Sequence, residues 1–234
     1  MRNTAKIPPS SPDPSQLQQP SFTNAQRSVV APLSLFSHGA LWAMSLFITL
    51  CVLVGFNATH GADQWIFALA NTAVSEPLDL AASFVSLLGN FEVTGVFTLA
   101  VSMLGWKRRG IPGLAPMLLF LGVAIEAVLK FFLPHPSLPE GYARNVEFLP
   151  PLRFPTPYSF PSGHMLRITF LAVYCTANRG PWRVIGWMIV LVMALTRLYL
   201  NEHWTSDIIG GVFLGLALAH VARMIDGRSA PHQS

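Results

Sequence analysis

Two side chains near the C-terminal end have the types and spacing that phosphoryl chemistry needs. Asp207 follows His203 by four residues, so the two share one face if a helix begins near His203. A carboxylate beside an imidazole fixes its tautomer and stabilises its cation, which makes the histidine a good nucleophile toward phosphorus. Arg197 adds a forked donor that matches phosphate oxygens. The pattern predicts a phosphoryl-transfer site; the alternative is an interfacial helix turn held by a salt bridge.

The segment from Phe160 to His164 (FPSGH) has the features of an anion-binding helix start. Proline suits the first turn because its missing N–H would be unpaired anyway, and Ser159 can cap the helix. The first N–H groups then point outward at the positive end of the helix dipole, where Gly163 lets an anion approach closely. His164 reaches the same anion, and a phosphate fits this description. The alternative is a capped helix start with a surface histidine.

The composition indicates which elements position these residues. The chain of 234 residues is 52% hydrophobic and only 11% charged, whereas a soluble domain is about 25% charged. With a mean hydropathy of +0.46, these values exclude an ordinary soluble domain and favour an integral membrane protein. The basic residues form no patch with interleaved aromatics, so no nucleic-acid partner is expected. Cys51 and Cys175 lie in apolar runs and are expected only to pack within helices.

Six apolar stretches approach the roughly 20 residues that cross a bilayer. The second is interrupted by Gly89, Asn90 and Glu92; Asn90 and Glu92 are expected to face the bundle interior at a helix break. A shorter stretch at 62–74 should lie flat in the interface. The prediction is an all-α, six-helix membrane bundle, with a disordered tail over 1–32, a transmembrane domain over 33–226 and a short tail over 227–234. The six spans are expected at about 34–56, 78–106, 113–133, 161–178, 181–200 and 205–225.

The basic residues also predict an orientation. Of the 15 lysines and arginines, ten lie on the side that holds both termini and five lie on the opposite side or near it. Because basic residues concentrate in cytoplasmic loops, both termini should be cytoplasmic. The expected location is a bacterial inner membrane. The proline-rich loop at 134–160 is then outside and is expected to form an active-site rim, the alternative being a plain linker. Four helix ends bring their ionisable side chains to this extracytoplasmic face: Lys130, His164, Arg197, His203 and Asp207.

Taken together, these motifs resemble the type 2 phosphatidic acid phosphatase family, which includes membrane lipid phosphatases and is related to vanadium haloperoxidases. The match rests on Lys130, on Pro-Ser-Gly-His at 161–164 and on Arg-x5-His-x3-Asp at 197–207. It extends over about residues 35–225. The resemblance implies a six-helix membrane bundle with its site on the extracytoplasmic side.

The resemblance also implies a role for each matched residue. His203 would take the phosphoryl group as a phosphohistidine, and Asp207 would orient it. His164 would protonate the leaving group and then activate water. No metal and no other cofactor is implied. The groups expected to hold the phosphoryl oxygens are Lys130, Ser162, the Gly163 amide and Arg197.

The chain departs from this family in the first motif, which is a lysine, six residues and then Arg-Pro. Ser137 and Leu138 stand in place of that pair, and the nearest look-alike, His135-Pro136, lies two residues early. One expected arginine is therefore missing, which bears on the substrate range.

Three arginines are candidates to replace it. Arg144 and Arg153 lie in the loop, and Arg167 lies three residues after His164 on the same helix face. Arg167 is the favoured candidate, in the site or directly behind it. Glu126 lies at similar depth and has two possible partners, Arg167 and, four residues on, Lys130.

The leading hypothesis is a membrane-bound phosphatase for a lipid phosphate or diphosphate, with that substrate and membrane lipids as its partners. Polyprenyl diphosphate, phosphatidate, phosphatidylglycerol phosphate and a lipid A phosphate are all candidate substrates. A lipid phosphotransferase using the same site is one alternative. A non-catalytic lipid-binding or transport protein is another, suggested by the altered first motif and by Glu92. Replacing His203 with alanine separates the enzymes from this last alternative.

Overall fold

The computed structural model describes residues 38–72, 74–139, 141–148, 155–176 and 180–227, and the regular elements within these ranges are all helical. The predicted tail at 1–32 and the start of the first span lie outside the described residues, as does the tail after residue 227. The elements are α1 (His38–Gly55), α2 (His60–Ala70), α3 (Glu76–Ser86), η2 (Leu87–Gly89), α4 (Phe91–Arg109), η3 (Ile111–Met117), α5 (Leu118–Phe132), α6 (Gly163–Thr176), α7 (Pro181–Tyr199) and α8 (Thr205–Ile225).

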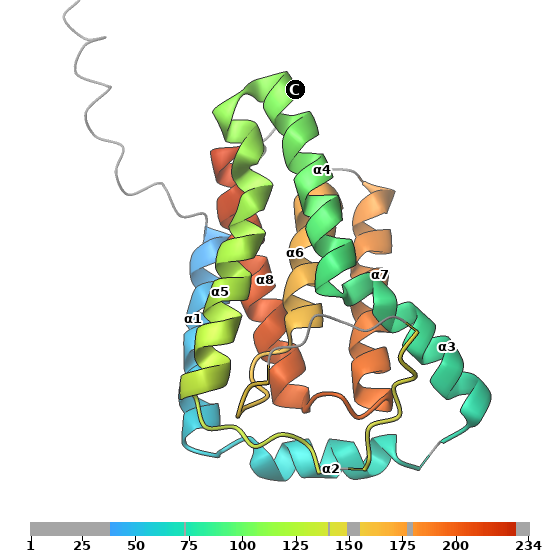
Figure 1. The fold of residues 1–234 in the computed structure, drawn as a ribbon. Coiled ribbons are helices and arrows are strands. Elements are labelled where there is room, and N and C mark those ends of the chain that lie inside the picture. Colours follow the sequence, from blue (N-terminus) through green and yellow to red (C-terminus); the bar gives the residue numbers. More distant parts are fainter. Residues whose placement is uncertain (1–37, 73, 140, 149–154, 177–179, 228–234) are drawn as a thin grey trace, which may run out of the picture. The chain divides into compact units, whose positions relative to one another are not determined.

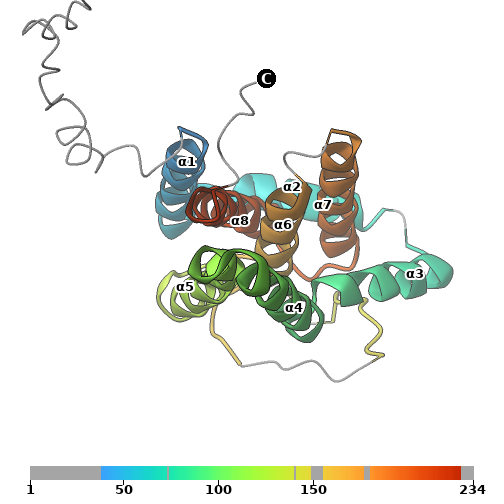
Figure 2. The ribbon, with the colours of Figure 1, turned by 90° about the horizontal axis from the view of Figure 1, so that it is seen from above.

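Helix α8 is the centre of the bundle. It contacts α1, α5 and α6, while α7 packs on the other side of α6 (Figures 1 and 2). The closest approach is between α6 and α8, where two glycines of α8 face the backbone of the neighbouring segment. A Cβ on Gly215 would lie 2.6 Å from the carbonyl oxygen of Leu166, and one on Gly211 would overlap the carbonyl of Ser162. Glycine at these positions therefore lets the helix that begins at Gly163 lie directly against α8.

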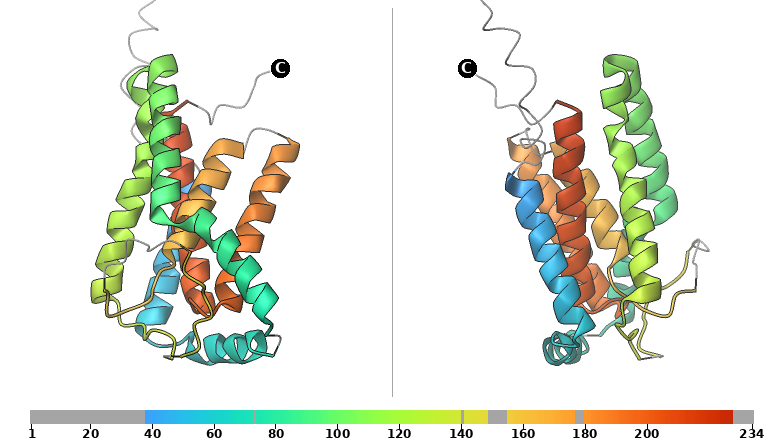
Figure 3. Two further views of the ribbon diagram at one scale, coloured as in Figure 1. Left: turned by 45° about the vertical axis from the view of Figure 1, so that its right-hand side comes forward. Right: turned by 90° about the vertical axis from the view of Figure 1, so that its left-hand side faces the viewer.

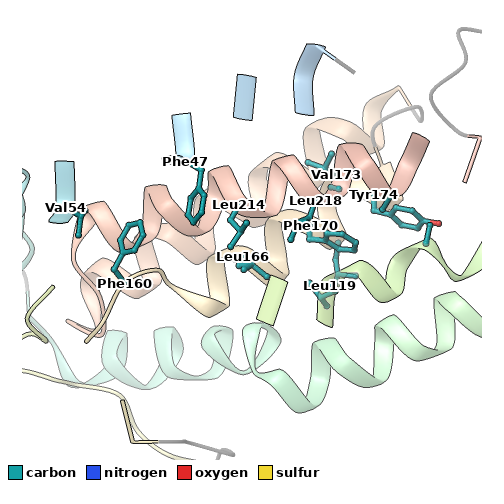
Figure 4. Close-up of a cluster of buried hydrophobic side chains, with 14 residues drawn as sticks. Phe47, Val54, Leu119, Phe160, Leu166, Phe170, Val173, Tyr174, Leu214 and Leu218 are labelled. Carbon is teal, nitrogen blue, oxygen red and sulfur yellow. The ribbon is translucent and has the colours of Figure 1, made fainter. Parts of the chain in front are cut away.

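The buried apolar core lies between α1, α5, α6 and α8, as Figure 4 shows. Other large apolar side chains point away from the bundle; Trp42 on α1 is 70% exposed and Val96 on α4 is 69% exposed. An apolar exterior of this kind suits lipid rather than water. The core cluster includes Phe47, Val54, Leu119, Phe160, Leu166, Phe170, Tyr174, Leu214 and Leu218.

Within the described residues, five helical stretches are long and apolar enough to cross a membrane: His38–Gly55, Glu76–Arg109, Ile111–Phe132, Pro181–Tyr199 and Thr205–Ile225. The span predicted at 161–178 corresponds to α6, which has 14 residues. Most of its side chains are buried, Met165 and Phe170 completely, because α4, α5, α7 and α8 all contact it. A sixth crossing by α6 therefore stays a prediction.

The break predicted in the second span is present. Helices α3 and α4 are joined by the 3-10 turn Leu87–Gly89, and Asn90 precedes the first residue of α4. The predicted interfacial stretch forms α2, which runs across the end of the bundle rather than along it (Figure 3). On α2, Trp65 is 69% exposed whereas Asp63 is 2% exposed. This helix therefore presents one face outward and one face to the bundle end.

The start of α6 differs from the prediction. Pro161 was expected in the first helical turn, but the helix begins at Gly163, and the carbonyl of Ser162 accepts the bond from Leu166 N at 3.1 Å. Ser159 does not cap this helix. Its hydroxyl donates instead to Asp207 Oδ1 at 3.2 Å. A tertiary partner from another helix thus takes the side chain that local sequence assigned to the cap.

Candidate active site

A cavity of about 690 Å³ lies where four helix ends meet. Lys130 is in the last turn of α5, and Arg197 is in the last turn of α7. Gly163 and His164 begin α6, and Asp207 is in the first turn of α8. The predicted convergence of distant helix ends is present. Of the predicted site residues, those that line the cavity are Lys130, Gly163, His164, Arg167, Arg197 and His203.

His203 and Asp207 form the pair that their spacing predicts. His203 lies just before α8, and its Nδ1 is 3.1 Å from Asp207 Oδ2. The same oxygen accepts a hydrogen bond from Trp204 N at 3.1 Å. Because an ionised carboxylate only accepts, the His203 proton is on Nδ1 and the lone pair is on Nε2. Asp207 is completely buried, so it acts on the imidazole from behind the cavity.

The surroundings of His203 keep its imidazole neutral. Burial, and then the positive charges of Arg197 and Lys130, hold the pKa of His203 well below its usual range. At neutral pH the unprotonated form predominates. The ring therefore carries a free electron pair on Nε2 beside two cations, as a nucleophile for a phosphate needs.

The two cations are each held by side-chain partners: Arg197 by one distant and one nearby residue, and Lys130 by a residue one turn earlier on its own helix. Arg197 is 3% exposed, and it donates to Ser86 Oγ at 2.6 Å and to Glu202 Oε2 at 3.1 Å. Lys130 donates to Glu126 Oε1 at 2.8 Å. These contacts fix both groups before any ligand binds, which lowers the reorganisation required on binding.

His164 is positioned by the break between α3 and α4. Its Nε2 lies 3.0 Å from Asn90 Oδ1, and a Cβ on Gly89 would overlap its ring. The sequence indicates a helix break at Gly89 and Asn90, but no sequence pattern indicates that these residues contact His164. The glycine makes room for the ring and the asparagine orients it.

Ser162 lies directly behind the cavity. Its N–H donates to the Asp207 carbonyl at 2.9 Å, which ties the start of α6 to the start of α8. Its Oγ is buried and has no hydrogen-bond partner within the described part of the chain. Because Ser162 does not line the cavity, its predicted role in binding stays a prediction.

Among the candidates for the missing arginine, Arg167 lines the cavity. Its Nε and Nη2 donate to the Gly89 carbonyl at 3.0 and 2.9 Å, and its Nη1 donates to Glu126 Oε2 at 3.4 Å. Glu126 thus contacts both of the partners that the sequence offers, Arg167 and Lys130. Its carboxylate also packs on Gly163, leaving no space for a Cβ there.

Arg144 is held elsewhere. Its guanidinium donates to Asn71 Oδ1 at 2.7 Å and to the Tyr199 carbonyl, and it lies 3.5 Å from Asp79 Oδ1. Arg144 does not line the cavity. Arg153 lies outside the described residues.

The long loop forms part of the cavity wall, as predicted. Residues on both sides of 149–154 line it, among them Ser137, Val146, Phe148 and Tyr158. In the described ranges no group of three or more histidine, cysteine, aspartate or glutamate side chains is arranged to hold a metal ion. The polar groups present suit a phosphate, because they combine cations, a helix N-terminus and a histidine pair.

Fold and site together define an integral membrane protein whose helix ends surround a cavity lined by cations and by a histidine bonded to a buried carboxylate. Residues 113–229, half of the chain, match the model of the PAP2 superfamily, and the chain belongs to this superfamily. The matched segment contains every residue from Lys130 to Asp207 that the motifs single out.

Individual relatives agree with this assignment. An undecaprenyl-diphosphatase of Sulfolobus acidocaldarius is 25% identical over 77% of this chain and 88% of its own length. Phosphatidylglycerophosphatase B of Bacillus subtilis is 25% identical over 83% of this chain and 94% of its own. Both names are those of lipid phosphatases.

Two solved structures share the fold. The PAP2-type phosphatidylglycerolphosphate phosphatase of Bacillus subtilis superposes with a TM-score of 0.65 at 19% identity, covering 84% of this chain and all of that one. LpxE of Aquifex aeolicus superposes with a TM-score of 0.54 at 21% identity, covering 69% of this chain and 94% of that one.

Proposed function

We propose that this chain is a membrane-bound phosphatase that hydrolyses a lipid phosphate or diphosphate through a phosphohistidine on His203. The observation that carries the proposal is the placement of His203. Its Nδ1 is bonded to Asp207, and it lines the same cavity as His164, Lys130 and Arg197. A nucleophile, an acid–base group and two cations are the parts that phosphoryl transfer requires.

In the proposed first step, His203 Nε2 attacks phosphorus and the bond from phosphorus to the leaving oxygen breaks. His164 gives its proton to that oxygen. Lys130, Arg197 and the Gly163 amide bind the other phosphoryl oxygens, where charge is greatest in the transition state. In the second step a water molecule attacks phosphorus, His164 takes a proton from that water, and the bond from phosphorus to His203 Nε2 breaks. Inorganic phosphate then leaves and the neutral imidazole of His203 is restored.

A lipid substrate is supported by the two kinds of surface in the cavity. The charged groups lie at the helix ends, whereas other lining residues are apolar, among them Leu87, Phe91, Val123 and Phe148. A phosphate head can bind the charged groups while its tail contacts the apolar ones. The two relatives fit such a substrate, since each is named for the phosphorylated lipid on which it acts.

We also propose that the site faces the extracytoplasmic side of a bacterial inner membrane and that both termini are cytoplasmic. The basic residues support this orientation. Lys107, Arg108 and Arg109 end α4, and Arg223 is in the last turn of α8, at the helix ends far from the cavity. A cysteine introduced at Ser137 should react with a membrane-impermeant thiol reagent added to spheroplasts. If that cysteine is labelled only after lysis, the site faces the cytoplasm and the proposed orientation is wrong.

A direct assay tests the phosphatase. Purified protein in detergent, with EDTA and no added divalent metal, is given a panel of lipid phosphates and diphosphates, and inorganic phosphate is measured. We expect phosphate release from at least one of them. Release only when an acceptor alcohol is added would indicate a phosphotransferase. No turnover and no phosphate transfer under any condition would contradict the proposed reaction.

Replacing Glu126 with glutamine tests how the site balances its charge. The Glu126 carboxylate forms ion pairs with both Lys130 and Arg167 and offsets one of their two charges, so it competes with an incoming phosphate for the same cations. When Glu126 loses its charge, inorganic phosphate should bind about tenfold more tightly as a competitive inhibitor. The free energy of that tenfold change is a fraction of the energy of one charge pair at an effective dielectric constant of about 20.

The matched control is Glu76→Gln, which removes the same charge from the exposed start of α3. Its inhibition constant for phosphate should equal that of the unaltered protein. If Glu126→Gln binds phosphate more weakly, the carboxylate serves to hold the cations in place rather than to limit their charge.

A further inference from the structure

The carboxylate of Asp207 has hydrogen-bond partners on both of its oxygens. Oδ2 accepts from His203 Nδ1 and from Trp204 N, as described above. Oδ1 accepts from Ser159 Oγ at 3.2 Å and lies 3.4 Å from His135 Nε2. His135 is thus behind the nucleophile, on the opposite side of Asp207 from His203.

His135 is the first residue of the Pro-flanked pair that resembles the missing Arg-Pro of the first motif, but it does not replace the arginine. Its side chain is 1% exposed, and it does not line the cavity. It lies 3.0 Å from Ser206 Oγ. The residue therefore belongs to a buried polar network and has no direct access to a phosphate in the cavity.

The direction of each hydrogen bond in this network follows from the donors available. Ser206 Oγ donates its single hydrogen to Asp63 Oδ2 at 2.7 Å, so it can only accept from His135 Nε2. The His135 proton is therefore on Nε2, between Ser206 and Asp207. This tautomer leaves Nδ1 as an acceptor without a hydrogen-bond partner within the described residues. A buried unpaired acceptor costs less free energy than a buried unpaired N–H.

Asp63 connects the network to the interfacial helix α2. It is 2% exposed, and its Oδ1 accepts from Ser206 N at 2.8 Å. That N–H belongs to the first turn of α8, where backbone donors lack partners within the helix. A carboxylate there is also favoured by the helix dipole. Asp63 thus anchors the helix start that carries Asp207.

We propose that His135 and Asp63 are positioning residues that act on His203 through Asp207. The inference rests on the proposed phosphatase function. As the bond from His203 Nε2 to phosphorus forms and the bond to the lipid oxygen breaks, the imidazole becomes cationic and keeps its Nδ1 proton on Asp207. Ser159 holds the other oxygen by a hydrogen bond, and His135 Nε2, whose proton lies between this oxygen and Ser206 Oγ, is 3.4 Å from it. These contacts keep the carboxylate from turning away while that charge develops. Asp63 holds the hydroxyl of Ser206 in place, and that hydroxyl in turn positions His135.

Two substitutions at His135 test this role. His135→Leu removes the donor, whereas His135→Gln can place an amide N–H near the position of Nε2. By analogy with groups that orient metal-bound histidines, His135→Leu should lower kcat by about 10- to 100-fold. KM should change little because His135 does not contact the substrate, and His135→Gln should restore most of the rate. Asp63→Asn should lower kcat in the same way but less, because its carbonyl still accepts from Ser206.

A probe that needs no turnover separates positioning from a loss of fold. Orthovanadate imitates five-coordinate phosphorus bonded to the nucleophile, whereas inorganic phosphate binds as a ground-state anion. In His135→Leu, inhibition by orthovanadate should weaken in proportion to kcat while inhibition by phosphate stays constant. Thr98→Val is the matched control, because Thr98 is fully buried and hydrogen-bonded in α4 outside this network; it should leave kcat and both inhibition constants unchanged.

The outcomes distinguish the two proposals. If the unaltered protein releases phosphate and His135→Leu keeps its full kcat, the positioning role is wrong and the phosphatase stands. An equal loss of vanadate and phosphate inhibition, with a lowered melting temperature, would show that His135 only supports the fold. If the unaltered protein itself has no phosphatase activity, the proposed function fails first.

Discussion

Replacing His203 with alanine should lower phosphate release by on the order of 10³-fold or more, because the variant has no nucleophile to accept the phosphoryl group. It should also form no acid-labile phosphoenzyme when the reaction is quenched in alkali. Rapid quenching with a ³²P-labelled substrate measures both quantities. His38→Ala, at the exposed start of α1, is the matched control and should behave like the unaltered protein.

Replacing His164 with alanine should have a different effect, which separates the roles of the two histidines. With p-nitrophenyl phosphate the leaving group needs no proton, so His203 should still be phosphorylated. Water then lacks its general base, and phosphoenzyme should accumulate. If His164→Ala traps no phosphoenzyme while His203→Ala does, the two roles are reversed.

The second large effect is expected at Arg197. Arg197→Ala should lower kcat/KM by about 10²- to 10³-fold, because a preorganised donor for the phosphoryl oxygens is lost. Arg197→Lys should recover only part of this, since lysine keeps the charge but not the fork that also bonds Ser86 and Glu202. Arg183→Ala, near the opposite end of α7, is the matched control and should leave kcat/KM unchanged.

Arg197→Ala should also change the pH dependence. Burial and then the Arg197 charge lower the pKa of His203, and the nucleophile is active only when unprotonated. Removing the charge raises that pKa, so the acid limb of kcat/KM should move to higher pH. Because both proteins use the same substrate, its own ionisation cancels in the comparison. An acid limb that does not move would show that His203 does not titrate in it.

Much of the fold could be predicted because a bilayer constrains sequence strongly. A helix that crosses it needs a long apolar run, so composition and run length indicate the membrane helices. The break at Gly89 and Asn90 and the short stretch predicted at 62–74, which overlaps α2, are visible for the same reason, since each departs from such a run. A membrane crossing by α6 is harder to predict, because other helices bury this helix and a buried segment need not be as long as one that faces lipid.

The site was predictable where function depends on local spacing. His203 and Asp207 are four residues apart, and Lys130 and Glu126 are also four apart, so the geometry of one helix turn is enough to pair them. The assignment of Ser159 as a cap was wrong because capping is a local preference. A buried carboxylate on another helix offered the hydroxyl a stronger bond.

Composition and residue spacing are enough to predict that the chain spans a membrane and that two histidines, an aspartate and several cations lie at one end of its helices. The residues behind them are known from the packed helices alone: Asn90 contacts His164, Ser86 contacts Arg197, and His135 and Asp63 lie behind Asp207. The physical reason is distance along the chain. Hydrogen bonds between residues far apart in sequence depend on how helices pack, and no local periodicity records that packing.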